Sequence, residues 1–214
     1  MKIWKKFGKL FKAKTIENIA IFGHADTTLK DKLYQDVLEV TKKLAEAGYT
    51  VVDGGGPGVM RAATEGAKLG LGEVVGVTWY PRDISIFEGR DKKNLFDREI
   101  KTRSYVERTL TLMKEGQVYV IFNGGTGTIS EFGMAWGLAR LYFGHHKPLI
   151  LYGKFWKKIM EAFKENMLLR KEELKVYKIV SSPEEVLEAI QRFEEELERG
   201  EHEHLKASSG DYTI

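Results

Sequence analysis

Residues 123–131, Asn-Gly-Gly-Thr-Gly-Thr-Ile-Ser-Glu, have the types and spacing most suited to chemistry in this chain. They follow an apolar run at 117–122 that suits a strand buried on both faces, and they lead into a helical apolar pattern at 128–143. A glycine-rich turn before a helix leaves backbone N–H groups unpaired, and the helix dipole favours negative charge there. The segment therefore predicts a phosphate-binding loop.

Five residues of this loop are the candidate phosphate ligands. The glycines remove side chains that would keep a phosphate away from the backbone amides, and the threonines add hydroxyl donors. The five are Gly124, Gly125, Thr126, Gly127 and Thr128.

Glu131 lies one turn further along, where its charge would repel a bound phosphate. Two interpretations are open from spacing alone. Thr128-x-x-Glu131 fits a capping box, in which the glutamate side chain accepts a hydrogen bond from the backbone N–H of the cap residue. Alternatively, the carboxylate lies beside the sugar of a nucleotide whose phosphate occupies the loop.

A second glycine-rich turn, Asp53-Gly-Gly-Gly-Pro-Gly-Val-Met60, also stands between a predicted strand and a predicted helix. Neither turn fits the G-x-G-x-x-G dinucleotide pattern, and the chain contains no P-loop sequence. A third, polar loop at 23–28 follows the first predicted strand. Because the turns after parallel strands share one edge of a sheet, we expect all three to meet at one crevice.

The elements that position these turns alternate along the chain. Strands are expected at 19–22, 49–52, 73–79, 117–122, 147–152 and 176–180. Helices are expected at 29–47, 57–69, 104–115, 128–143, 155–169 and 182–199. This alternation predicts an α/β fold, a Rossmann-like doubly wound parallel sheet with helices on both faces. Residues 80–102 are charged and irregular, which predicts a long loop.

The 214 residues are enough for one sizeable core. We expect a single Rossmann-like nucleotide-binding domain at 15–200, after a basic amphipathic segment at 1–14 and before a polar tail at 201–214. The apolar stripe of residues 1–14 is expected to pack on the domain or on a partner subunit. A membrane-surface helix is the alternative.

Composition excludes several classes of protein. The 34 basic and 31 acidic residues give a net charge of +3, which does not argue for a nucleic-acid partner. The absence of cysteine excludes disulfides and thiolate metal sites and is compatible with the reducing cytoplasm, the location we expect. We find no apolar run long enough for integral membrane contact, no signal peptide, and no metal-ligand spacing among the histidines and acids.

Together, Gly54-Gly-Gly-Pro-Gly-Val-Met60 and Gly124-Gly-Thr-Gly-Thr-x-x-Glu131 closely resemble the two signatures of the LOG family. The resemblance extends over roughly residues 19–180. Many LOG proteins are nucleoside 5'-monophosphate phosphoribohydrolases, although the family was often labelled "possible lysine decarboxylase". Members carry an Arg-Lys pair on the helix before the second signature, and here Arg108 is followed by Thr109.

Two further positions depart from the family pattern. Asn123 stands where the family usually has proline before the paired glycines. Arg61 follows Met60, where relatives with a similar first signature have glutamate. A decarboxylase is not expected, because that chemistry normally uses a pyridoxal Schiff-base lysine and neither glycine motif contains lysine.

The resemblance implies that the substrate is an AMP-like nucleoside 5'-monophosphate, hydrolysed to free base and ribose 5-phosphate. It also implies a homodimer or higher homo-oligomer and the use of neither metal nor organic cofactor. Glu131 would stabilise the oxocarbenium-like sugar, and Arg108 would orient Glu131 or bind the phosphate. The opposite wall of the site would be formed by Gly23, Gly55, Gly56, Gly58 and Met60.

A second interpretation remains open. The same loops suit a non-catalytic protein that binds or carries a nucleotide or the molybdenum cofactor, a phosphorylated pterin, as some relatives do. Thr109 and Asn123 favour this interpretation, because they replace family residues near the catalytic pair.

Overall fold

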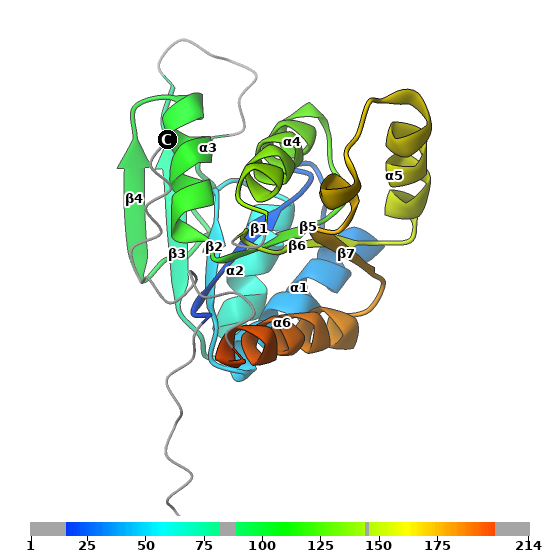
Figure 1. Cartoon of the computed structure of the whole chain (residues 1–214). Helices are drawn as coiled ribbons and strands as arrows, with labels where there is room; N and C mark the ends of the chain where they lie inside the picture. The colour runs from blue at the N-terminus through cyan, green and yellow to red at the C-terminus, as the bar shows by residue number, and fades with distance from the viewer. Residues whose placement is uncertain (1–15, 82–88, 144–145, 200–214) are drawn as a thin grey trace, which may run out of the picture.

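Seven parallel strands form one sheet in the computed structural model, which describes residues 16–81, 89–143 and 146–199 (Figure 1). The strands are β1 Asn18–Phe22, β2 Thr50–Asp53, β3 Val74–Trp79, β4 Arg98–Thr102, β5 Val118–Ile121, β6 Leu149–Tyr152 and β7 Tyr177–Val180. The predicted segments at 1–14 and 201–214 lie outside the described residues.

The strand order is β4-β3-β2-β1-β5-β6-β7, and every neighbouring pair is parallel. The chain moves outward from β1 to β4 and then returns to place β5 on the other side of β1. The order therefore reverses between β1 and β5. In doubly wound sheets such a reversal opens a ligand crevice beyond the carboxyl ends of the strands.

Helices cover both faces of the sheet (Figure 1). They are α1 Lys32–Glu46, α2 Val59–Leu69, α3 Tyr105–Glu115, α4 Thr126–Leu141, α5 Phe155–Asn166 and α6 Pro183–Glu198, with a short 3-10 helix η1 at Lys171–Leu174. Alternate strand residues divide the core: Ile19 and Ile21 pack with α1, α2 and α6, whereas Ala20 and Phe22 pack with α3, α4 and α5. The predicted Rossmann-like α/β fold is confirmed.

One predicted loop is wrong in part. Residues 98–102, expected to be irregular, form the edge strand β4, paired with β3 from Val75 to Trp79. Ile100 is the only apolar residue in this strand. Charged side chains are common on edge strands, where they prevent pairing with another sheet, so the apolar pattern of a buried strand is missing. Glu99 of this strand accepts hydrogen bonds from Thr78, Tyr80 and Arg90 at 2.8, 3.0 and 3.1 Å, so its charge is satisfied within the fold.

Helices α1 and α5 each have one boundary that differs by three residues from the sequence prediction. Helix α1 begins at Lys32 instead of 29, because the Asp31 carboxylate accepts the backbone N–H and hydroxyl of Thr28 at 2.7 and 2.8 Å. Helix α5 ends at Asn166 instead of 169, and η1 follows it. Among the described helices, none has the length and apolar character needed to cross a membrane.

Candidate functional site

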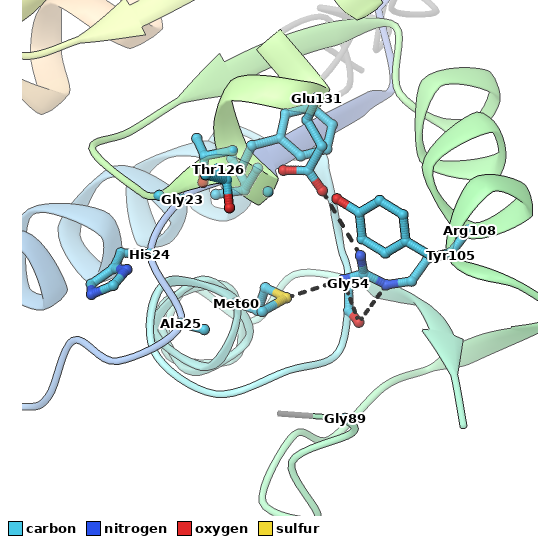
Figure 2. A pocket seen from close by; sticks show the side chains of 15 residues that line it. Gly23, His24, Ala25, Gly54, Met60, Gly89, Tyr105, Arg108, Thr126 and Glu131 are labelled. Carbon is cyan, nitrogen blue, oxygen red and sulfur yellow. Dashed lines mark hydrogen bonds and ion pairs between the residues drawn. The ribbon is translucent and has the colours of Figure 1, made fainter. Parts of the chain in front are cut away.

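A cavity of about 220 Å³ opens at the carboxyl edge of the sheet, where the strand order reverses (Figure 2). The loops after β1, β2, β3 and β5 contribute to it, together with helices α2, α3 and α4. Its lining consists of Ile21, Phe22, Gly23, His24, Ala25, Gly54, Met60, Gly89, Tyr105, Arg108, Gly125, Thr126, Gly127, Thr128 and Glu131. The three predicted turns therefore meet at one crevice. The loop after β1 joins the other two, because the His24 N–H donates to the Asn123 carbonyl at 3.0 Å and the His24 carbonyl accepts the Val59 N–H at 2.9 Å.

The first turn of α4 forms one end of the cavity. Gly125 is its N-cap residue, and no described side chain caps the turn, so the first backbone N–H groups are left for a ligand. A Cβ placed on Gly125 would meet no described atom within 4 Å, and its φ of −92° is open to any residue. Neither packing nor backbone conformation requires glycine at 125. The space beside it suits a phosphate, whose approach a side chain would obstruct.

Gly124 has a different structural role from Gly125. A Cβ there would lie 2.1 Å from the Thr128 hydroxyl oxygen and 3.0 Å from the His24 nitrogen. Gly124 is absent from the cavity lining. It allows the loops after β1 and β5 to close against each other, whereas Gly125 and Gly127 lie at the cavity surface.

The capping-box interpretation of Glu131 is wrong. Helix α4 begins at Thr126, two residues earlier than predicted, so Thr128 lies inside the helix and is buried. The Glu131 side chain is only 10% exposed and lines the cavity. With the described residues it makes no hydrogen bond, and its charged neighbour is Arg108, whose Nη1 lies 3.8 Å from Oε1 (Figure 2).

Burial changes the acidity of this carboxyl. Desolvation raises the pKa of Glu131 to about 7, and the positive charge of Arg108 opposes this rise. A carboxyl that titrates near neutral pH can change its protonation state during a reaction cycle. Perturbed groups in cavities are candidate functional residues, and here the geometry supports the same assignment.

Arg108 is fixed by two backbone carbonyls, that of Gly54 just after β2 and that of Val77 within β3. Its Nε donates to the carbonyls of Val77 and Gly54 at 3.2 and 3.3 Å, and its Nη2 donates to that of Gly54 at 3.0 Å. These bonds leave Nη1 directed towards Glu131 (Figure 2). The planar guanidinium can hold several such partners at once, which a lysine ammonium could not reproduce in this geometry.

The first glycine motif provides the seat for this arginine. A Cβ on Gly54 would lie 1.6 Å from Arg108 Nη2, so the arginine side chain can keep this position only beside glycine. The turn itself is tied down by Asp53, whose carboxylate accepts the Gly55 N–H at 2.7 Å and the Thr64 hydroxyl at 2.9 Å. Burial raises the pKa of Asp53 to about 7, although these hydrogen bonds and the charge of Arg108 oppose the shift.

The expected wall residues are placed differently from the prediction. Gly54 and Met60 line the cavity, whereas Gly55, Gly56 and Gly58 do not. Gly55 and Gly58 have φ of +75° and +63°, and a Cβ on Gly58 would lie 2.3 Å from the Ala25 carbonyl oxygen. These three glycines shape the turn, while Gly23 lines the cavity as expected.

Several lining residues were missed by the sequence prediction, among them His24, Gly54 and Tyr105. Tyr105 precedes Arg108 by three residues, which places both on one face of a helix. This spacing could have predicted that Tyr105 lies near Arg108 at the site. Gly54 was missed because its role depends on an arginine 54 positions away.

The three departures from the family pattern lie outside the cavity lining. The hydroxyl of Thr109 donates to the carbonyl of Tyr105 within α3 at 3.1 Å, and the side chain is buried. Asn123 contacts His24 through its backbone, a bond that does not depend on its side chain. The last departure, Arg61, pairs at its Nε with Glu65 at 2.8 Å.

In the described part of the chain, no three acidic or histidine side chains are grouped closely enough to hold a metal ion. What the cavity combines is an uncapped helix N-terminus, a buried carboxyl and an immobilised guanidinium. This combination can bind an anion at one end and stabilise developing positive charge a few ångströms away.

Known proteins resemble this chain in sequence or in fold. A curated relative, an uncharacterized protein of Archaeoglobus fulgidus, is 26% identical over 123 residues, which cover 58% of this chain and 77% of the relative. The molybdenum cofactor binding protein of Rippkaea orientalis superposes with a TM-score of 0.62 at 23% identity, over 83% of this chain and 97% of that chain. DNA processing protein A of Helicobacter pylori, which binds single-stranded DNA, gives 0.56 at 14% identity, over 83% and 81%.

These structural likenesses establish the fold alone, because sequence identity is low. The family is established separately, by a match that spans most of the chain and both glycine motifs. The model of the SLOG cluster4 family matches residues 16–186, which confirms the resemblance to LOG proteins and shows that this chain belongs to the SLOG cluster4 family.

Proposed function

We propose that this protein hydrolyses the N-glycosidic bond of an AMP-like nucleoside 5'-monophosphate, releasing the free base and ribose 5-phosphate. One observation carries the proposal. Glu131, a buried carboxyl without a hydrogen-bond partner among the described residues, shares a cavity with the uncapped N-terminus of α4 and lies 3.8 Å from Arg108. A carboxylate held only to position an arginine would be expected to bond to it directly.

In this proposal the 5'-phosphate binds at the start of α4. The backbone N–H groups of the first turn and the hydroxyl of Thr126 donate to its oxygens, and the helix dipole favours its charge. Gly125 and Gly127 leave the approach open. This anchoring positions the sugar, so binding energy far from the scissile bond is used to orient it.

Glu131 then acts on the sugar. As the glycosidic bond breaks, its electron pair leaves with the base nitrogen, and positive charge develops on the ribose ring. The ionised carboxylate stabilises that charge, and a water molecule attacks C1', transferring a proton to Glu131. The departing base takes a proton from solvent, and Glu131 releases the proton it received from water back to solvent, which regenerates the ionised carboxylate. Arg108 favours the ionised form of Glu131, because its charge lowers the pKa that burial raises.

A second candidate function is binding or carrying of the molybdenum cofactor. The fold shared with the Rippkaea orientalis protein supports it, and the phosphate of a pterin cofactor would suit the same helix N-terminus. In that case Glu131 would contact the ligand without changing it. Both candidate functions thus use the anion end of the cavity. They differ in whether Glu131 takes part in a reaction or only contacts the ligand.

Other expectations remain predictions. They are the cytoplasmic location, the homodimer or higher oligomer, the absence of a nucleic-acid partner, of a metal and of an organic cofactor, and the domain limits at 15 and 200.

A panel of AMP, GMP, CMP and UMP, incubated with purified protein and resolved by chromatography, tests the proposal. Release of free base from at least one of them, together with ribose 5-phosphate, is the expected result. Binding of nucleotides without cleavage over long incubations would contradict the enzymatic proposal. If the protein also co-purified with a pterin, the carrier function would be selected.

A further inference from the structure

Tyr105 is a cavity residue that the proposed reaction does not use. It is the first residue of α3 and lies beside Arg108 and Glu131 in the cavity wall (Figure 2). Its hydroxyl oxygen lies 3.0 Å from the Ser130 hydroxyl oxygen on the facing turn of α4. A Cβ placed on Gly127 would lie 3.6 Å from the same tyrosine oxygen, so the hydroxyl is close to the anion end of the cavity.

The direction of the hydrogen bond between these two hydroxyls follows from the number of protons available. Ser130 donates its one hydroxyl proton to the carbonyl of Gly127 at 2.7 Å, one turn back in its own helix. With that bond in place, the Ser130 oxygen accepts at the 3.0 Å contact with Tyr105, and the Tyr105 hydroxyl donates. With its own proton committed to Ser130, the Tyr105 oxygen is left with acceptor capacity alone.

The ring that carries this oxygen is held in place. Trp79, at the end of β3, contacts it edge-on with ring centroids 6.3 Å apart. The backbone carbonyl of Tyr105 accepts the hydroxyl of Thr109 at 3.1 Å, and Ser104 caps the helix by accepting the Glu107 N–H at 3.1 Å. The acceptor is therefore preorganised, as specificity contacts need to be.

We infer that the Tyr105 hydroxyl is a specificity-determining acceptor, which selects ligands that present an O–H or N–H donor to it. The inference rests on the proposed function and adds to it. In a purine ribonucleotide bound by its phosphate at α4, such a donor comes either from a sugar hydroxyl or from the exocyclic amino group of the base. A ligand with an acceptor at that point would place its lone pair against the Tyr105 oxygen with no proton between them. Such a ligand would bind more weakly.

Equilibrium titration of four ligands tests this inference. They are AMP, 2'-deoxy-AMP and 3'-deoxy-AMP, which each lack one sugar hydroxyl, and IMP, which lacks the amino group. A Glu131→Gln background prevents turnover during the titration. Tyr105→Phe, which removes the hydroxyl and keeps the ring, is expected to weaken AMP binding roughly threefold to tenfold. It should not weaken binding of the one analogue that lacks the partner group, and that analogue shows whether the partner belongs to the sugar or to the base.

Two further variants sharpen the result. Tyr80→Phe removes a tyrosine hydroxyl that bonds to Glu99 outside the cavity lining, and it is expected to leave all four affinities unchanged. If the base is the partner, Ser130→Ala frees the Tyr105 proton, so the hydroxyl can also donate and the preference for AMP over IMP should narrow. If a sugar hydroxyl is the partner, that preference should stay as it was, because a hydroxyl can accept as well as donate.

Failure of the inference can be told from failure of the proposed function. Should Tyr105→Phe weaken all four ligands equally, or none of them, Tyr105 has no selective role and the inference is overturned while nucleotide binding stands. Should none of the four ligands bind either the wild-type chain or the Glu131→Gln chain, the proposed function fails and this inference fails with it.

Discussion

Arg108 and Glu131 face each other at 3.8 Å without a direct hydrogen bond, because the arginine is already held by the carbonyls of Gly54 and Val77. The pair joins two glycine motifs that are about 70 positions apart in the sequence. The second motif forms the anion end of the cavity, and the first seats the arginine. The second motif thus serves to bind the anion, and the first holds the positive charge that acts on Glu131.

Glu131→Gln should remove turnover while keeping the nucleotide bound. The amide cannot carry the charge that stabilises the sugar, and losing one such stabilising group typically costs about 10²- to 10³-fold in kcat. Nucleotide affinity should change much less, because the phosphate site at α4 is untouched. Steady-state release of free base, compared with titration of the same variant, measures both quantities. A variant with wild-type kcat would remove Glu131 from the mechanism.

Gly54→Ala should disable the site through the arginine. The new Cβ would occupy the position of Arg108 Nη2, which would have to move away from Glu131. We expect kcat/KM to fall at least about tenfold, as in other cases where a catalytic group is misplaced by an ångström. Circular dichroism and thermal unfolding would establish that the variant is folded. Undiminished kcat/KM in folded protein would show that Arg108 need not hold its position.

Gly125→Ala should weaken phosphate binding without changing the stability of the fold. Because a Cβ at 125 meets no described atom within 4 Å, the variant should fold with wild-type stability, yet its methyl group would obstruct the phosphate. Gly137→Ala in the same helix is the matched control, since its Cβ also meets nothing, and it should gain roughly 0.5–1 kcal/mol in stability. Phosphate and AMP titrations of both variants would show the difference. Equal affinities would place the anion elsewhere.

Glu131 should lower the stability of the unliganded protein as pH rises from about 5 to 7. Burial raises the folded-state pKa of Glu131 from 4.5 to about 7, so in this window the folded state binds more protons than the unfolded state. The stability present at low pH is lost as pH rises through the folded pKa. Asp53, whose pKa is also raised to about 7, acts in the same direction.

Urea unfolding at pH 5 and at pH 7.5 measures this effect. Glu131→Gln should show a smaller loss of stability between the two pH values than the wild type, by an amount on the order of 3 kcal/mol. The comparison goes no lower than pH 5, because the carboxyls with a lowered pKa, such as Asp97, destabilise the fold when they are protonated at lower pH. Equal pH dependence of the two proteins would contradict the assignment of a raised pKa to Glu131.

The fold and the anion end of the site were predictable from the sequence because their signals are local. Apolar runs followed by glycine turns at 54 and 124 locate the carboxyl edge of the sheet, and parallel topology makes the turns converge. Strand β4 was missed because Arg98–Thr102 lies at an edge, where charged side chains replace the apolar pattern of a buried strand.

The remainder of the site depends on contacts that no local pattern records. Gly54 touches Arg108 across 54 positions, and Tyr105 meets Ser130 across 25. The role of Glu131 was open because Thr128-x-x-Glu131 matches a capping box, which the start of α4 at Thr126 and the lack of a capping hydrogen bond among the described residues exclude. In such cases sequence spacing can identify candidate site residues, but their contacts depend on tertiary packing.

A structure of Glu131→Gln crystallised with AMP tests the central claim most directly, because the variant should hold its substrate uncleaved. We predict that the phosphate lies on the backbone N–H groups at the start of α4, with C1' of the ribose beside residue 131 and Arg108 still bonded to the Gly54 carbonyl. A nucleotide bound elsewhere, or one whose phosphate occupies α4 while its sugar points away from residue 131, would contradict it.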